Sequence, residues 1–590
     1  MADFDVVGIS RTSPGIRFWR GDYTSLFVAT ILALVCHTQA DAAVINAKSA
    51  SFGDVSSVVA MASDGDTVAI PAGTASWTSY LVITKGITLQ GQTSTDVGAN
   101  TANDQTIILD DVPRGGACAL ISAPALTASQ SLRVTGITFK VGAVKAPNSN
   151  GAIQLNGNCP SVRVDHCHFK DLYAVYLLTT GSIYGVIDHN IFDAGNSCQV
   201  AQIHGTGDGD AEWAAPSEFG SANFMFFEDN RFNNNYFDST GQQYQTIGVI
   251  DCYAGGRYVA RHNWFNGVSP LANHGWDSSG RLRSSRAIEV YENNITANYA
   301  TSGGQSRGGC LLFYKNTITG KAGGAPGLTC YRMFIPGFVD GASGSSPWDF
   351  NDTTDHTGNG FGGGLNGLYA SGRTTSGSHS GAKGFMTKAG AGWATNQWVG
   401  YEVSNTRTKR NSFIVGNTND TLTYVFDTGF DPNGNLNFAS GDPFEIRKVL
   451  IAMDQPGRGQ GDLLANNPPV NTKTGTAAWP HQALEPCYFW ENTLNGNPTP
   501  GTSIYPNLQE NRDYYNGAPM RGYTPFTYPH PLTKSLPPSL PTAHNITRSS
   551  AHNLHKKWKR QAKELKGKKE KTAKQNSANE MAEDQKGLGQ

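Results

Sequence analysis

Seven segments of the chain share one alternating pattern of apolar and polar positions, as in "YGVIDHNIFDAG" and "FMFFEDNRFNNN". In each segment an apolar residue stands three places before a reference position, and another stands two places after it. The reference positions are Cys167, Asn190, Asn230, Asn263, Asn293, Asn316 and Asn492. Because neighbouring residues of a strand point to opposite faces, the pattern predicts a strand with one buried face, a turn, and a second short strand.

The spacing of the reference positions predicts a solenoid. Successive positions lie 23 to 40 residues apart up to Asn316, and a longer stretch separates Asn316 from Asn492. A recurring unit of this size, with a strand and a turn, can bury its apolar column only against the next unit. We expect each Asn to bond to its equivalent one coil away, about 4.8 Å distant, and to adopt the left-handed turn conformation itself.

The region before the repeats predicts the start of such a solenoid. The segment "FGDVSSVVAMAS" has the spacing of an amphipathic helix, and "DGDTVAIPAG" and "LVITKGITLQG" read as strands. A helix at this place would cover the open end of the first sheet.

These motifs resemble those of the right-handed parallel β-helix proteins of the pectate-lyase-like superfamily. The resemblance covers residues 43–320 and resumes over residues 482–495. More narrowly, "HGWDSSGRLRSSRAIEVYENN", "RGGCLLFYKNTITG", "MDQPGRGQGDLL" and "ENRDYYNGAPMRGYTPFTYPHPL" resemble segments of exported bacterial β-helix proteins without an assigned reaction. The resemblance implies an all-β fold, a right-handed parallel β-helix with an N-terminal capping helix.

The chain divides by composition into five parts. Arg17 and Arg20 precede the apolar run "SLFVATILALV", which together with the small-residue stretch "ADA" is typical of a signal peptide. We predict a signal peptide (1–42), a parallel β-helix (43–320), an inserted Gly-rich β lobe (321–481), a last coil with a wrapping segment (482–532), and a Pro-rich then Lys-rich disordered tail (533–590). This predicts a secreted, periplasmic or cell-surface protein without a transmembrane segment.

Composition narrows the classes of partner. The chain has 590 residues, of which 16% are charged, and a net charge of −1, which argues against a nucleic-acid partner. Its 68 Gly favour a loop-rich β protein, which we expect to be a monomer. The eight cysteines after the signal peptide form no CxxC pair, so a zinc ribbon is disfavoured, and both disulfides and stacked buried thiols stay open.

A column of acidic residues suggests a metal site. Asp165, Asp188 and Glu228 stand two places before successive reference positions, so they are expected to point outward on successive coils. Stacked carboxylates repel one another unless a cation neutralises them, and Ca²⁺ prefers such oxygen ligands. The resemblance also implies Ca²⁺, since β-helix pectate lyases bind it with acids on an outer strand face. The alternative is a solvated face with Arg261 paired to Glu228.

Arginines, histidines and acids crowd into residues 251–307 and suggest chemistry on an acidic polysaccharide. β-Elimination at a uronate needs the substrate carboxylate neutralised, a base, and a proton donor for the leaving oxygen. In this hypothesis Arg286 and Arg307 clamp the carboxylate, His274 or Arg261 is the base, and Tyr291 is the acid. The further expected substrate-binding residues are Arg257, Arg281, Arg283 and Glu289. The alternative is that these charges form structural ion pairs.

Two other functions compete with a polysaccharide lyase. A non-catalytic carbohydrate-binding or surface-adhesion protein can use the same scaffold, because one fold hosts many functions. A face on which every Arg is paired with a carboxylate would favour binding or structure. A glycoside hydrolase would need paired carboxylates, and "HGTGDGDAEW" offers Asp208, Asp210 and Glu212, although the stretch does not match the polygalacturonase-like pattern.

Overall fold

The computed structural model describes residues 42–534 except for several segments. These segments are residues 114–118, 145–151, 174, 196–198, 207–211, 214, 235–247, 274–282, 298–302, 321–326, 329–367, 382, 400, 409, 427–435, 449–453, 460–482 and 504–507. The predicted signal peptide, except for its last residue, and nearly all of the predicted tail therefore lie outside the described residues.

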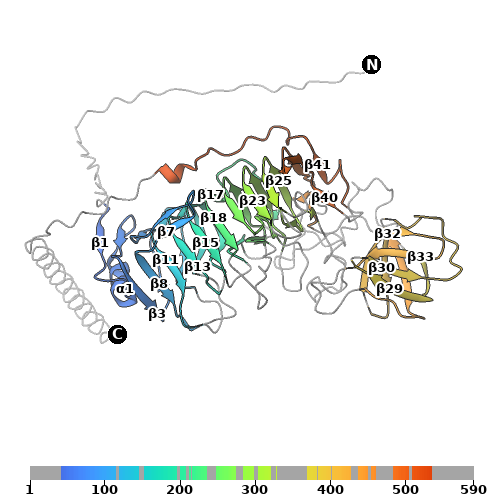
Figure 1. Cartoon of the computed structure of the whole chain (residues 1–590), viewed down its shortest axis with the longest axis horizontal. Helices are drawn as coiled ribbons and strands as arrows, with labels where there is room; N and C mark the ends of the chain where they lie inside the picture. The colour runs from blue at the N-terminus through green and yellow to red at the C-terminus, as the bar shows by residue number, and fades with distance from the viewer. Residues whose placement is uncertain are drawn as a thin grey trace, which may run out of the picture. The chain divides into compact units, whose positions relative to one another are not determined.

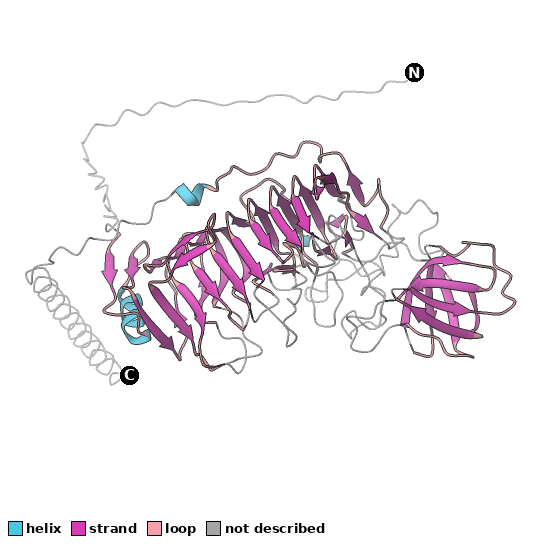
Figure 2. Cartoon of the chain, viewed as in Figure 1, coloured by secondary structure: helices cyan, strands magenta, loops and turns pink. Residues whose placement is uncertain are grey.

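The described chain is nearly all β and is dominated by long parallel sheets (Figures 1 and 2). The main path of the largest sheet, called sheet A here, runs in chain order through β1 (Val44–Asn46), β2 (Thr67–Ala69), β5 (Thr88–Gln90), β10 (Leu132–Thr135), β12 (Ile153–Asp165), β14 (Leu177–Asp188), β17 (Met225–Glu228), β20 (Arg257–Arg261), β22 (Ala287–Tyr291), β25 (Cys310–Tyr314), β37 (Cys487–Trp490) and β41 (Tyr514–Asn516). Every neighbouring pair on this path is parallel.

A second sheet, called sheet B, follows the same succession. It comprises β3 (Gly73–Trp77), β8 (Thr106–Asp110), β11 (Thr138–Val141), β13 (His168–Lys170), β15 (Ile191–Ala194), β18 (Arg231–Asn234), β21 (Trp264–Asn266), β23 (Asn294–Ala297), β26 (Thr317–Gly320), β38 (Thr493–Leu494) and β39 (Asn497–Pro498). Its pairs are parallel except for the last, β38 with β39. Since a strand of sheet A precedes each strand from β11 to β38, the chain passes repeatedly from one sheet to the other, as a solenoid does.

Shorter strands form a third side. β4 (Leu81–Val82), β9 (Ile121–Leu126), the first halves of β12 and β14, β16 (Ala201–His204) and β19 (Ile250–Tyr253) pair in parallel. β24 (Gln305–Ser306), β27 (Gly327–Leu328) and β40 (Thr502–Ser503) form a separate parallel sheet. Two small antiparallel pairs are β6 (Ser94–Asp96) with β7 (Thr101–Asn103), and β35 (Arg458–Gly459) with β36 (Ala483–Leu484).

The predicted inward columns form the core. Phe169, Phe192, Phe232 and Phe265 stack on successive strands of sheet B, with ring centroids 4.7 to 4.9 Å apart. The segment predicted to be helical contains α1 (Phe52–Met61), whose Val55 joins the same core. Each coil thus buries apolar surface against its neighbours, which is what the repeat pattern requires.

The asparagine ladder is confirmed, but one detail of its prediction is wrong. The side-chain oxygen of Asn263 accepts from both the backbone N–H and the side-chain amide of Asn230, at 3.0 and 3.1 Å. The same pair of hydrogen bonds links each reference position to the next from Asn190 to Asn492. The left-handed conformation, however, belongs to the residue before each Asn, such as His189 and His262, with φ of 55° and 57°. The Asn itself is fully buried, so its role is to bond neighbouring coils rather than to turn the chain.

An antiparallel sheet stands between the ladder positions Asn316 and Asn492. Its order is β28 (Leu368–Arg373), β34 (Pro443–Lys448), β31 (Tyr401–Asn405), β32 (Arg410–Asn417), β33 (Thr421–Val425), β30 (Lys383–Thr387) and β29 (Ser376–Ser380). It has an apolar core of its own that includes Met386, Trp398 and Phe444. The solenoid pairing continues past this insertion, since β37 pairs directly with β25. The predicted domain boundaries themselves stay predictions.

Two further expectations concern cysteines and membranes. The five described cysteines are all buried free thiols, and they are Cys159, Cys167, Cys252, Cys310 and Cys487. Cys118, Cys198 and Cys330 lie outside the described residues. Among the residues that the structure describes, no helix is long and apolar enough to cross a membrane.

Candidate functional site

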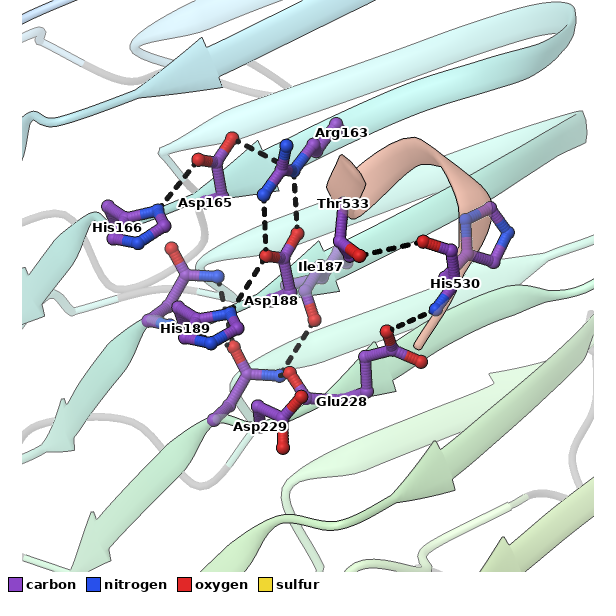
Figure 3. Close-up of polar contacts among 12 residues, drawn as sticks. Arg163, Asp165, His166, Ile187, Asp188, His189, Glu228, Asp229, His530 and Thr533 are labelled. Carbon is purple, nitrogen blue, oxygen red and sulfur yellow. Dashed lines mark hydrogen bonds and ion pairs between the residues drawn. The ribbon is translucent and has the colours of Figure 1, made fainter. Parts of the chain in front are cut away.

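The three acids expected to bind Ca²⁺ do lie on successive coils. Asp165, Asp188 and Glu228 end β12, β14 and β17 and are paired by the strand register. Figure 3 shows them along the end of sheet A. All three side chains are fully buried, so the solvated face given as the alternative to a metal site is not observed.

Arginines neutralise this acid column. Arg163 bonds to Asp188 at 2.9 Å and also approaches Asp165 at 3.4 Å, while Arg133 bonds to Asp165 at 2.6 Å. Burial opposes the ionisation of Asp165, but the hydrogen bond from Arg133 and its neighbours hold the pKa of this carboxyl well below its usual range. These contacts are buried ion pairs, not the solvated ones of the alternative interpretation.

Two half-exposed histidines also bond to the column (Figure 3). Nδ1 of His166 lies 2.8 Å from Asp165, and Nδ1 of His189 lies 2.9 Å from Asp188. Because an ionised carboxylate only accepts, each Nδ1 must carry the proton. The hydrogen bond to Asp188 raises the pKa of His189. With these contacts, the oxygens of both aspartates are engaged by protein donors.

The geometry gives the Ca²⁺ expectation no support. Within the described parts of the chain, no group of three or more His, Cys, Asp and Glu side chains is arranged to hold a metal ion. An arginine lies beside each acid and neutralises it, where a cation would otherwise be needed.

A C-terminal strap, defined as residues 520–534 and ending in the 3₁₀ helix η1 (Pro531–Lys534), covers the outer face of sheet A. Arg261 donates to the carbonyl oxygens of Phe526 and Thr527 at 2.6 and 2.8 Å. The backbone N–H of His530 donates to Glu228 at 2.7 Å, a contact visible in Figure 3. The strap therefore bonds to charged groups that were expected to face a substrate.

Four of the predicted site residues, Arg261, Glu228, Tyr291 and Glu289, lie under this strap. Arg261 bonds to Glu228 at 2.7 Å and to the Tyr291 hydroxyl at 2.9 Å. Glu289 accepts from the hydroxyl of Tyr523 in the strap. Burial raises the pKa of both Tyr291 and Glu289. The sequence thus identified a real cluster, but its groups bond to one another and to the strap.

The predicted carboxylate clamp is occupied by the protein itself. Arg286 is fully buried and holds Glu485 through two hydrogen bonds of 2.7 and 3.0 Å. Arg283 is paired with Asp454 at 2.8 Å. A bidentate pair of this kind satisfies the guanidinium as a substrate carboxylate would.

The remaining predicted site residues, including the candidate base His274, are buried or lie outside the described residues. Arg257 donates to the carbonyl of Pro216 at 2.9 Å, and Arg307 donates to the carbonyl of Asn273 at 3.1 Å. His274 and Arg281 belong to the stretch 274–282, which the structure does not describe.

A different surface, which we call the polar face, was missed in the sequence. It consists of the outward side chains of the first halves of β12 and β14 and of β16 and β19, since the alternate side chains of these strands join the core. Its residues are Gln154, Asn156, Leu178, Thr180, Gln202, His204, Asp251 and Tyr253. The strand register aligns them in two rows, one residue per coil.

Most of the polar face is partly accessible. Except for Leu178 and Asp251, its residues are half-buried, although Oδ1 of Asn156 and Nε2 of His204 are themselves covered. The rings of His204 and Tyr253 lie 3.8 Å apart between centroids. Gln199 donates to Asp251 at 2.9 Å and accepts from Gln202 at 2.6 Å. The signal that could have revealed this face is the short alternation in "AIQLNGN" and "VAQIHG", which precedes the aligned pattern or falls between its repeats.

Two comparisons with known proteins found no match to this chain. No protein-family model matches the chain, and no curated protein matches it.

Proposed function

We propose that this chain is a carbohydrate-binding solenoid protein whose ligand lies on the polar face. The observation that carries the proposal is the contrast in how polar groups are used. The described arginines of the predicted catalytic cluster bond to protein groups, whereas the polar face keeps half-buried side chains with amide, hydroxyl and phenol groups. Such groups hydrogen-bond to sugar hydroxyls, and a tyrosine ring offers an apolar surface beside them.

The finer description of the scaffold is part of the same proposal. The parallel sheets, the asparagine ladder and the motifs of the first coil support a right-handed parallel β-helix of the pectate-lyase-like type. The basic residues and apolar run near the start of the sequence support export to the periplasm, cell surface or medium. Both agree with a role in contact with extracellular carbohydrate.

A polysaccharide lyase is the second candidate. In its original form it relies on His274 and Arg281, which lie outside the described residues, and on arginines that are paired internally. A specific observation still favours elimination chemistry, now on the polar face. The adjoining rings of His204 and Tyr253 are of the types that serve as a base and a proton donor.

One experiment separates the two candidates. The chain from residue 43 to about residue 544, the limits set by the signal and tail predictions, is incubated with neutral and uronate polysaccharides, with Ca²⁺ or with chelator. Binding is measured by affinity electrophoresis, and cleavage by the ultraviolet absorbance of unsaturated uronate. Retention without absorbance supports binding alone, and absorbance lost in His204→Ala supports the lyase. Neither retention nor cleavage on any polymer contradicts the proposed function.

A further inference from the structure

Glu212 lies where the ends of two polar-face strands meet. Its carboxyl carbon is 3.1 Å from the position that a Cβ atom would take on Gly205, which directly follows His204. The carbonyl oxygen of Ala254, the residue after Tyr253, lies against that same position. The ends of β16 and β19 and the Glu212 carboxylate therefore converge on one point.

The two oxygens of this carboxylate have different surroundings. Oε1 accepts from the backbone N–H of Thr206 at 2.6 Å and from the Thr206 hydroxyl. Oε2 is buried and has no hydrogen-bond donor within the described residues, and Glu212 as a whole is only 9% exposed. Leaving a buried acceptor without a donor costs stability, so a group from outside the protein is expected to supply one.

Arg257, which contacts the backbone of Glu212, has a hydrogen-bond donor without an acceptor among the described residues. Arg257 donates from Nη2 to the carbonyl oxygens of Pro216 and Glu212, at 2.9 and 3.5 Å, and it is only 6% exposed. Its Nε–H has no acceptor among the described residues. A hydroxyl group both donates and accepts, whereas a carboxylate only accepts. A carboxylate would also bring a second negative charge close to Glu212.

We propose that the polar face selects neutral carbohydrate, with Glu212 Oε2 accepting a hydrogen bond from a sugar hydroxyl. This inference rests on the proposed function, which places carbohydrate on the polar face. It departs from the acidic polysaccharide expected from the sequence. The Glu212 carboxylate places a negative charge at this end of the face, which disfavours a uronate.

Calorimetric titration of the full chain with defined hexasaccharides tests the inference. The probes are xylohexaose, cellohexaose and mannohexaose as neutral sugars, and hexagalacturonate and hexaguluronate as acidic ones. We expect one neutral sugar to bind at least about tenfold more tightly than either acidic sugar, as expected for one charge-assisted hydrogen bond gained or lost. We expect Glu212→Gln to weaken that binding about tenfold, because an amide places an N–H where the hydroxyl needs an acceptor.

The matched control is Glu218→Gln, which changes a nearby glutamate that is bonded to Asn223 and should leave binding unchanged. Tighter binding of an acidic sugar, or full binding by a folded Glu212→Gln chain, overturns the inference and leaves carbohydrate binding standing; in the second case only a buried water fills the site. No binding of any probe overturns the proposed function and this inference with it. Should Glu212→Gln fail to fold, the neutral-to-acidic preference of the wild-type chain still decides.

Discussion

The covered face of sheet A and the polar face belong to the same solenoid, yet they use polar groups in opposite ways. On the covered face, charged side chains are buried and paired, and the strap supplies the bonds that remain, as it does for Arg261. On the polar face, uncharged polar side chains stay half-exposed. Charge density alone is therefore a poor guide to function in a solenoid, because a buried charge needs partners in the protein itself.

Breaking a buried pair of the covered face should have the largest effect. Arg261→Ala leaves the fully buried Glu228 without its guanidinium, so we expect the free energy of unfolding to fall by about 3–5 kcal/mol. The measurement is chemical denaturation followed by circular dichroism. Lys315→Ala is the control, because this half-exposed lysine pairs with Glu292 at the surface and should cost about 0–1 kcal/mol. Equal losses in both variants would contradict the assigned role of the covered face.

A substitution in the asparagine ladder should cause the next largest loss of stability. Asn263→Ala removes a buried side chain that bonds to both neighbouring coils, and we expect a loss of about 1–3 kcal/mol in unfolding free energy. Asn266→Ala, three residues later on exposed surface, should change stability by no more than about 0.5 kcal/mol. Equal losses of unfolding free energy in the two variants would contradict the architectural role of the asparagine ladder.

The strap should carry a signature in the dependence of stability on pH. Burial lowers the pKa of His530 to about 4, below the usual value of a histidine. The unfolded chain therefore binds a proton more readily than the folded one, so this residue makes stability fall as pH drops from about 6.5 to 4. His530→Asn keeps an acceptor for the N–H of Leu532 and should flatten that decline. Parallel stability curves for the two chains would show that His530 does not titrate in this way.

The smallest effect on stability should come from the polar face. Gln154→Ala is expected to change the unfolding free energy by no more than about 0.5 kcal/mol, as surface substitutions usually do. It should nevertheless weaken binding of the preferred hexasaccharide, since it removes one amide from the row. A clear loss of stability with unchanged binding would assign Gln154 to the scaffold and sharpen the boundary of the face.

The sequence predicted the repeated features and missed those that occur once. The phenylalanine column and the asparagine ladder recur on coil after coil, so the alignment reveals which side faces inward. The pairing of Arg286 with Glu485 joins residues far apart in the chain, and no local pattern encodes it.

The site was harder to predict for two physical reasons. Whether Glu228 faces water depends on the strap, which arrives from about 300 residues later along the chain. The polar face lies on short stretches of strand whose alternation is too brief to stand out, and two of its strands, β16 and β19, have no reference Asn of their own. The sequence shows which side chains of a strand point outward, but it does not show whether another segment of the chain covers them.

Hydrogen exchange of the full chain with and without its preferred hexasaccharide tests the central claim most directly. The account predicts added protection at residues 153–159, 177–183, 201–206 and 250–257, with the strap unchanged. Changes confined to residues 520–534 and the strands beneath them would contradict it and return the site to the covered face.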